Sequence, residues 1–348
     1  MHIMNNELYR EDIQRCAAHN IHWEKFQNKS VLITGASGLI GSFLIDVLMY
    51  KQLNCKIYAV GRDEKKAQER FADYWENDHF CFVTADINQG LFMEETSIDY
   101  VIHAASNTHP IAYAEDPIGT ITTNVIGTYN LLEFSVQRNV ERAVFLSSVE
   151  IYGENRGDCE KFTEDYCGYI DCNTMRAGYP ESKRAGEALC QAYIKQKGLN
   201  IVIPRLPRTY GPTMQMSDSK AIAQFIKKGI AGEDVVLKSN GTQLYSYCYV
   251  SDTVSGILWC LLEGICGEAY NIADDNSDIY MKDLAQIIAN YTEKKVVFNL
   301  PAATEQAGYS KATKAVMDSC KLQALGWKAI YTMGEGLERT IEILKQTY

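Results

Sequence analysis

The sequence lacks an apolar run long enough to cross a membrane, which would take roughly 20 consecutive apolar residues. Its polar start, MHIMNNELYREDIQRC, also lacks the apolar stretch of a secretory signal peptide. Positive charge is scarce, because 34 lysines and arginines accompany 44 aspartates and glutamates, and the formal net charge is -10. Nucleic acids and anionic membranes are usually bound by basic surfaces, so we expect neither as a partner. We predict a cytoplasmic protein that acts on small molecules.

Motifs for metal ions and disulfides are missing as well. The eleven cysteines are scattered singly, no two of them are spaced as Cys-x-x-Cys, and the six histidines show no metal-ligand spacing beside them. Cys55, Cys190 and Cys260 stand within apolar runs, which is typical of reduced core cysteines in a cytosolic protein. We therefore expect no metal site.

What the sequence does contain is an alternation of apolar segments of strand length with segments of helix length. The expected strands lie within residues 30–34, 55–63, 79–87, 98–106, 142–153 and 199–212. Short apolar runs without polar alternation are typical of strands covered on both faces, and helical connections make such strands parallel. The pattern predicts an α/β fold with a doubly wound parallel Rossmann sheet.

After residue 205, helical stretches mix with short extended pieces, which indicates a smaller α+β lobe over the carboxyl edge of the sheet. The expected organisation is an N-terminal extension over 1–28, a dinucleotide-binding Rossmann domain over 29–205 with a returning segment near 246–270, and a substrate-binding lobe formed by 206–245 and 271–348.

A glycine-rich turn, TGASGLIG, follows the first expected strand directly and opens a helix. This is the context that a dinucleotide-binding turn requires, because bare backbone can approach a pyrophosphate and the helix N-terminus offers free N–H groups and a favourable dipole. The expected cofactor contacts in the turn are Gly35, Ser37, Gly38, Leu39, Ile40 and Gly41.

The ends of the second and third expected strands carry further cofactor contacts. Arg62 is placed to pair with the 2′-phosphate of NADP, whereas Asp63 beside it is placed to bond the ribose 2′-hydroxyl of NAD. NAD is expected, and NADP is not excluded. Asp86 and Ile87 are placed to meet the adenine, and a plain strand-end cap is an equal alternative for Asp86.

The pattern Tyr-x-x-x-Lys occurs three times, at Tyr179/Lys183, Tyr193/Lys197 and Tyr291/Lys295. Residues four apart are neighbours on a helix, so each lysine can hold its charge near the phenol. Spacing alone does not choose among the three pairs.

The motifs together resemble the extended branch of the short-chain dehydrogenase/reductase superfamily, which comprises nucleotide-sugar epimerases, dehydratases and decarboxylases. TGASGLIG is followed, in the order of that family, by ADI, HAAS, TNVIGT, LSSVEIYG, YPESK, YGP, YVSD and LGW. The resemblance implies that Ala104 and Ala105 of HAAS border the cofactor and that only Tyr179 faces the nicotinamide. It also implies a homodimer formed through a two-helix face.

The resemblance further implies the chemistry of the site. Tyr179 takes the proton of a sugar hydroxyl as hydride leaves for the nicotinamide, and Lys183 also bonds the nicotinamide ribose. Because a free phenol has a pKa near 10, we expect the lysine cation and the positive cofactor ring to lower the pKa of Tyr179. Ser148 matches the family residue that hydrogen-bonds the reacting oxygen, while Ser147 packs or touches the cofactor, and Asn124 is structural.

The residues near the sugar bear on the reaction class. Glu150 stands where dehydratases and decarboxylases of the family place an acid beside the sugar. At this position its carboxylate would remove a sugar proton α to the 4-keto group. The alternative is a glutamate that faces solvent. Val149 weakens an elimination, because thymidine-linked hexose dehydratases carry a proton-donating acid at that position.

The closest overall resemblance is to UDP-glucuronate decarboxylases, with two departures. The family's arginine in the glycine-x-glutamine loop is here Tyr245, and its asparagine before YGP is here Arg208. We expect Thr108, Arg208 and Tyr245 to contact substrate. A guanidinium at position 208 either grips a phosphate or carboxylate or forms a surface ion pair.

We therefore expect an enzyme that modifies a nucleotide-diphosphate sugar through a transient 4-keto intermediate, as an epimerase or a decarboxylase. One alternative is a net NAD(P)H-dependent reductase or dehydrogenase of a keto-sugar or polyol. Another is a non-catalytic cofactor-binding regulator with a vestigial Tyr/Lys pair.

Overall fold

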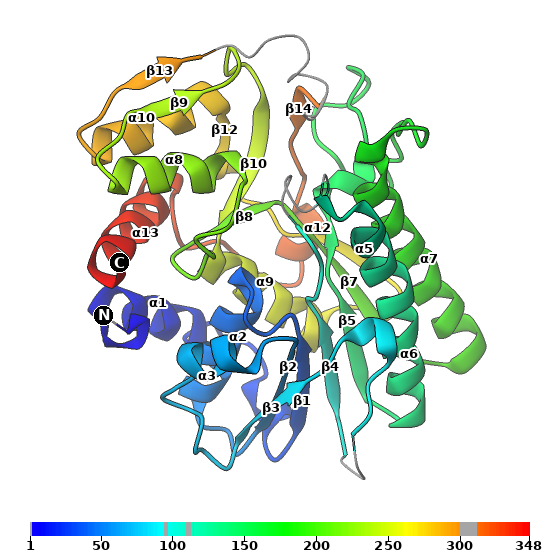
Figure 1. Ribbon diagram of the computed structural model, residues 1–348. Coiled ribbons are helices and arrows are strands. Elements are labelled where there is room, and N and C mark those ends of the chain that lie inside the picture. The colour runs from blue at the N-terminus through cyan, green and yellow to red at the C-terminus, as the bar shows by residue number, and fades with distance from the viewer. Residues whose placement is uncertain (1, 94–96, 109–112, 114, 300–311) are drawn as a thin grey trace.

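A parallel sheet forms the centre of the molecule in the computed structural model, which describes residues 2–93, 97–108, 113, 115–299 and 312–348 (Figure 1). The strand order is β11-β7-β5-β4-β1-β2-β3, and a short strand, β6, also pairs with β7. The strands are β1 (Ser30–Thr34), β2 (Lys56–Gly61), β3 (Phe80–Thr84), β4 (Tyr100–His103), β5 (Arg142–Phe145), β6 (Ser147–Ser148), β7 (Ile201–Leu206) and β11 (Ala269–Asn271).

Strand β1 shows why the sheet is parallel and central. All five of its residues are buried, as expected for a strand covered on both faces. It pairs in parallel with β2 on one side, Ser30 opposite Lys56, and with β4 on the other, Val31 opposite Tyr100. The chain therefore reverses its direction of winding between β1 and β4, and ligands of doubly wound sheets bind at this switch point. The predicted fold class is confirmed.

Helices cover both faces of this sheet. Helices α1, α2 and α9 pack on one another, and α5, α6 and α7 lie together on the opposite face (Figure 1). Their bounds are α1 (Glu7–Ala17), α2 (Leu39–Lys51), α3 (Glu64–Arg70), α5 (Pro117–Thr122), α6 (Thr128–Gln137), α7 (Gly178–Lys197) and α9 (Val250–Glu263), with a π-helical segment, η4 (Thr123–Gly127), between α5 and α6.

A second, smaller group of elements stands over the carboxyl edge of the sheet (Figure 1). Strand β10 pairs in parallel with β8 and β14 and antiparallel with β12, while β9 pairs with β13. The strands are β8 (Arg208–Tyr210), β9 (Val235–Leu237), β10 (Leu244–Tyr249), β12 (Asp278–Tyr280), β13 (Val296–Phe298) and β14 (Lys314–Ala315). The helices are α8 (Ala221–Ile230), α10 (Met281–Tyr291), α12 (Cys320–Gln323) and α13 (Met333–Thr347).

The first helix, α1, is built into the core. Asp12 is fully buried and accepts hydrogen bonds from Tyr249 Oη at 2.5 Å, Tyr331 Oη at 2.8 Å and Arg339 Nε at 2.6 Å. Tyr9, one turn earlier, donates to Asp46 of α2. The N-terminal helix thus connects the C-terminal helix α13 with the first helix of the Rossmann sheet.

None of the helices in the described part of the chain has both the length and the apolar character needed to span a bilayer.

Candidate active site

The glycine turn after β1 has the shape of a cradle with bare backbone. Gly35 adopts φ +68°, and a Cβ there would lie 2.7 Å from the carbonyl carbon of Ala104. A Cβ on Gly41 would lie 2.4 Å from the oxygen of Gly35. Helix α2 starts after Gly38, where no side chain accepts a helix N–H, so the first N–H groups are left for a ligand. These features fit the pyrophosphate of a dinucleotide.

The segment that follows β8 forms hydrogen bonds with the glycine turn. Thr213 Oγ1 donates to the carbonyl oxygen of Leu39 at 2.7 Å, and Gln215 Nε2 donates to that of Ser37 at 3.2 Å. Residues far apart in sequence therefore meet beside the predicted cofactor turn.

The acidic residues at the strand ends act as helix caps in the structure. Asp63 accepts a hydrogen bond from Lys66 N at 3.1 Å and caps α3, and Asp86 accepts one from Asn88 N at 3.0 Å. The cap weighed as an alternative for Asp86 is thus present. Arg62 is exposed at the end of β2, and Ile87 is buried.

A glycine substitution tests the cradle. Gly35 and Gly198 share φ +68°, so alanine at either position bears the same left-handed strain of roughly 1–2 kcal/mol. Only at position 35 does the new Cβ also press on the Ala104 backbone, whereas nothing lies within 4 Å of it at position 198. We expect Gly35→Ala to raise the Kd for NAD at least about tenfold by calorimetry and Gly198→Ala to leave it unchanged. Equal effects would contradict the assignment of this turn.

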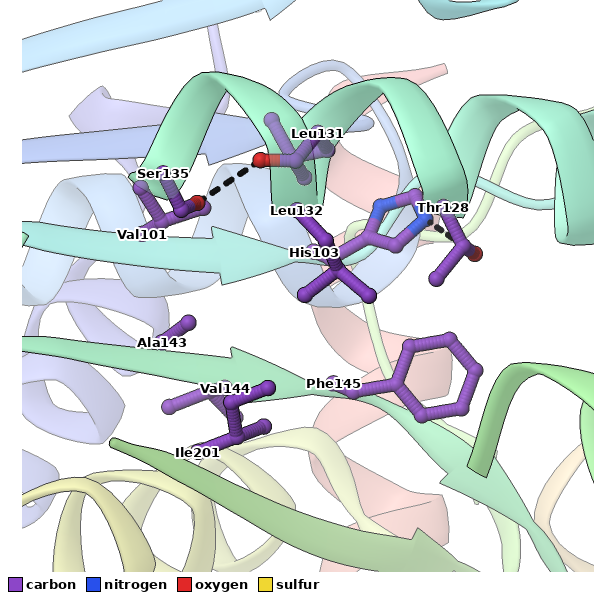
Figure 2. Close-up of a pocket in the computed structure, with 10 residues that line it drawn as sticks. All are labelled: Val101, His103, Thr128, Leu131, Leu132, Ser135, Ala143, Val144, Phe145 and Ile201. Carbon is purple, nitrogen blue, oxygen red and sulfur yellow. Dashed lines mark hydrogen bonds between the residues drawn. The ribbon is translucent and has the colours of Figure 1, made fainter. Parts of the chain in front are cut away.

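His103 at the end of β4 is a structural residue. Its ring lies beneath α6 (Figure 2), where Nδ1 bonds Thr34 Oγ1 at 2.8 Å and Nε2 bonds Thr128 Oγ1 at 3.0 Å. Burial, followed by the Lys183 charge, lowers the pKa of His103 to about 3, so the imidazole is neutral. The cavity beside it holds about 10 Å³, about the room of a single water. It is too small for a sugar.

The predicted catalytic residues Tyr179, Ser148 and Glu150 meet at the carboxyl edge of the sheet. Tyr179 lies in the first turn of α7 and is only 7% exposed. Its hydroxyl lies near the hydroxyls of Ser148 and Ser106 and near the Glu150 carboxylate, all of which affect its pKa. Ser148 Oγ also accepts the backbone N–H of Glu150 at 3.2 Å, so it caps the short helix η5 (Val149–Tyr152).

A chain of three hydrogen bonds ends at the backbone of Tyr179. Ser106 Oγ donates to Asn124 Oδ1 at 2.7 Å, Asn124 Nδ2 donates to Ser182 Oγ at 2.9 Å, and Ser182 Oγ donates to the carbonyl oxygen of Tyr179 at 2.8 Å. Asn124 sits in the π-helical segment, a rare form that often marks functional sites. Its side chain ties the end of β4 to the helix that carries Tyr179.

The chain's own residues raise the pKa of Tyr179, whereas the predicted lowering included the positive ring of the bound cofactor. Burial and then the Glu150 carboxylate raise this pKa, and the hydrogen bond from Ser148 and the charge of Arg176 offset only part of the rise. The predicted lowering relied on nearby cations, but the Lys183 ammonium donates to the carbonyl oxygen of Leu146 at 2.8 Å. Burial lowers the pKa of Lys183 to about 8.

Two residues near Tyr179 were missed by the motif comparison. Arg176 Nη2 pairs with Glu150 Oε1 at 2.7 Å, so Glu150 has a charged partner rather than facing solvent alone. Tyr113 stacks on Tyr179 with ring centroids 5.0 Å apart, and the guanidinium of Arg176 lies 5.0 Å from the Tyr113 centroid. An arginine three residues before Tyr179 was a visible signal, whereas the stacking of Tyr113 depends on tertiary structure alone.

The Glu150 charge gives a pH prediction. Because this carboxylate raises the pKa of Tyr179, Glu150→Gln should move phenol ionisation to lower pH. Phenol ionisation is followed by ultraviolet absorbance, and the titration of the same protein with Tyr179→Phe is subtracted. The difference isolates one phenol among 22 tyrosines. Glu181→Gln is the control, since Glu181 pairs with Arg184 at 3.3 Å and is half-exposed. A shift to higher pH in Glu150→Gln would contradict the geometry.

The other two Tyr-x-x-x-Lys pairs lie elsewhere. Tyr193, later in α7, donates its hydroxyl to Glu133, and Tyr291 is 38% exposed at the end of α10. Neither borders the glycine turn.

The predicted substrate contacts lie on the lobe side of the site. Arg208 Cζ stands 3.5 Å from the ring centroid of Tyr245, so these two residues form a stacked pair. Thr108 is exposed, and Lys220 Nζ contacts its hydroxyl at 3.4 Å while pairing with Asp218 at 2.9 Å. No described residues form a cluster of His, Cys, Asp or Glu suited to a metal ion.

Comparison with known proteins gives consistent matches. The model of the NAD dependent epimerase/dehydratase family matches residues 31–273. UDP-glucuronic acid decarboxylase 6 of Arabidopsis thaliana is 32% identical over 314 residues, which cover 89% of this chain and 87% of that protein. The structure of the epimerase Mth375 from Methanothermobacter thermautotrophicus superposes with a TM-score of 0.80 at 21% identity, covering 98% and 96% of the two chains. A Bacillus cereus UDP-glucuronic acid 4-epimerase, in complex with UDP-glucuronic acid and NAD, gives 0.78 at 23% identity, covering 92% and 100%.

Proposed function

Because this chain belongs to the NAD dependent epimerase/dehydratase family, we propose that it converts a nucleotide-diphosphate sugar through a transient 4-keto intermediate. The observation that carries the proposal is the buried hydroxyl of Tyr179, whose pKa responds to both the Ser148 hydroxyl and the Glu150 carboxylate beside it. A proton acceptor, an oxygen-orienting hydroxyl and a second base meet at one point of the sheet edge where ligands of this fold bind.

Each side chain has a role that its position supports. When bound in the glycine cradle, NAD would accept a hydride from C4 of the sugar and later return it. Tyr179 takes the C4 hydroxyl proton, and Ser148 holds the same oxygen in line. Lys183, anchored on Leu146 and buried, supplies positive charge that favours the phenolate when its amine is protonated. The Ser106–Asn124–Ser182 bonds fix the phenol that performs the transfer.

The reaction on the keto-sugar is either decarboxylation or epimerisation. A carboxylate at C5 of a 4-keto sugar is positioned β to the carbonyl, so its loss as CO2 needs no acid from the protein. Glu150, which pairs with Arg176, can instead exchange a proton α to the carbonyl. Val149 is buried and donates no proton, which argues against elimination of water. The UDP-glucuronic acid decarboxylases among the relatives favour decarboxylation.

Product analysis tests the proposal. The full chain is incubated with UDP-, GDP-, CDP- and TDP-sugars, and products are followed by mass spectrometry and NMR. Loss of the mass of CO2 identifies decarboxylation, and an unchanged mass with altered couplings identifies epimerisation. Stoichiometric oxidation of added NADH would instead support the net reductase, and cofactor that stays bound through gel filtration would oppose it.

We also propose a homodimer formed through α5 and α6. Apolar side chains on these helices are exposed, namely Ile118 at 75%, Ile121 at 41% and Tyr129 at 48%. Helices α5 and α6 lie beside α7 on one face of the sheet (Figure 1). Large exposed apolar patches on soluble proteins commonly mark interfaces.

Light scattering after gel filtration checks this surface. We expect Ile118→Arg to convert a dimer to a monomer, because an arginine buried at a symmetric interface meets its own copy or apolar atoms. Ile265→Arg is the control, since Ile265 is 63% exposed at the end of α9, away from these helices. A wild-type monomer would contradict the proposal.

A cytoplasmic location is proposed from the cysteines. All eleven are unpaired, and Cys16, Cys190 and Cys260 are buried in the core. Free thiols in this number are typical of a reducing compartment.

A further inference from the structure

Arg208 has a buried nitrogen that lacks a partner. Its Nη1 is buried and makes no hydrogen bond to any residue that the structure describes. Buried donors in native proteins nearly always have an acceptor, and an unsatisfied cationic donor is the costliest case. Such a donor beside a ligand site indicates an anionic acceptor supplied by the ligand.

Three other cations near this edge already form ion pairs with carboxylates, although Arg176 Nη1, like Arg208 Nη1, is buried without a hydrogen bond to the described residues. Arg176 pairs with Glu150 at 2.7 Å, Arg205 with Glu187 at 2.7 Å, and Lys220 with Asp218 at 2.9 Å. Arg208 forms no such ion pair within the described chain. Among these four cations it is therefore the one with charge to offer a ligand.

Strand register places the Arg208 guanidinium near the reacting end of the site. Arg208 is opposite Tyr247 of β10, and Tyr245 lies two residues earlier on the same face of that strand. The guanidinium stacks on Tyr245, and the parallel register sets Tyr245 at the level of Leu206. Leu206 is itself opposite Ser148. The guanidinium thus approaches the row of residues that holds the reacting oxygen.

We propose that Arg208 selects a sugar with an acidic group and that Tyr245 is the positioning residue for its guanidinium. This inference rests on the proposed function. A ring 3.5 Å from the guanidinium carbon fixes its plane through the face of the guanidinium and does not occupy its N–H edge, where Nη1 has no partner among the described residues. That edge matches the two oxygens of a carboxylate. Tyr245 is held in turn by its hydroxyl, which donates to Ala312 O at 2.7 Å.

The residue types at positions 208 and 245 are consistent with their stacking. An arginine at position 245 would repel Arg208 at this distance, whereas a tyrosine ring attracts it. The cation that contacts the sugar is thus supplied from β8, and β10 contributes the surface that orients it. The diphosphate of the substrate is the other candidate acceptor, but the level of Ser148 favours a group on the sugar ring.

Calorimetry on the NAD-loaded full chain with UDP, UDP-glucose and UDP-glucuronate tests the inference. For Arg208→Met we expect the Kd of UDP-glucuronate to rise about 10- to 100-fold, while those of UDP and UDP-glucose change by less than about twofold. Arg156→Met is the matched control, because Arg156 stacks on Tyr169 at 4.1 Å on the exposed surface. The Arg156→Met protein should bind all three ligands with the Kd values of the wild type.

Tyr245 variants separate positioning from structure. Tyr245→Phe keeps the ring and should keep the preference for UDP-glucuronate, whereas Tyr245→Leu should lose most of it with unchanged affinity for UDP. Equal weakening of all three ligands in Arg208→Met would assign the guanidinium to the diphosphate and overturn the inference, as would no change. If the wild type binds none of the three ligands, the inference is overturned, and the proposed function fails as well only if the GDP-, CDP- and TDP-sugars are not converted either.

Discussion

Replacement of Tyr179 by phenylalanine is expected to lower kcat by about 10²- to 10⁴-fold, the usual contribution of a positioned acid or base. The variant removes one oxygen from a ring that is 7% exposed and stacked on Tyr113, so packing is preserved. Cofactor affinity should stay within about twofold of wild type, because the glycine cradle is untouched. The measurement is steady-state turnover of whichever nucleotide sugar reacts, together with calorimetry of NAD.

The chain provides its own controls for this substitution. Tyr193→Phe and Tyr291→Phe change the other two Tyr-x-x-x-Lys pairs, one later in the same helix and one in α10. Both should retain kcat, since neither phenol borders the cradle. If Tyr179→Phe kept full activity, or if all three variants lost it equally, the assignment of the base would be wrong.

Removal of the Asp12 carboxylate is expected to cost about 3–5 kcal/mol of unfolding free energy, as for other broken buried ion pairs. In Asp12→Ala, Arg339 loses its 2.6 Å partner, and the hydroxyls of Tyr249 and Tyr331 lose their acceptor. Each group would remain buried without compensation. Urea unfolding followed by tryptophan fluorescence measures the change.

Glu11 supplies the control for Asp12. It pairs with the same guanidinium at 3.1 Å, but its side chain is 44% exposed, so water can replace it. Glu11→Ala should cost less than about 1 kcal/mol. Similar losses for both variants would show that the buried cluster does not hold the N-terminal helix to α13.

Local patterns predicted most of the Rossmann sheet. The five residues of β1 are apolar or small and all buried, and the following glycines have the backbone geometry that the turn needs. The family match over residues 31–273 confirms the resemblance drawn from the motif order. Motif order also separated Tyr179 from Tyr193 and Tyr291, which spacing alone did not.

Features that depend on contacts between distant segments were not predictable in the same way. Asp12 looks like one polar residue of an N-terminal extension, yet its partners Tyr249, Tyr331 and Arg339 lie more than two hundred positions away. The rise in the Tyr179 pKa that burial causes was not predictable, because sequence shows which charges exist but not how deeply the phenol is buried. The stack of Arg208 on Tyr245 joins two strands whose register appears only in the fold.

The most direct test follows a label at the reacting carbon. A reactive nucleotide sugar that carries deuterium at C4 is converted by the full chain in the presence of unlabelled NADH, and the product is analysed by NMR. The mechanism predicts that deuterium returns to C4 of the product, because removal and return of the hydride occur within one binding event. Deuterium that is found instead in free cofactor, with hydrogen at C4, would contradict it.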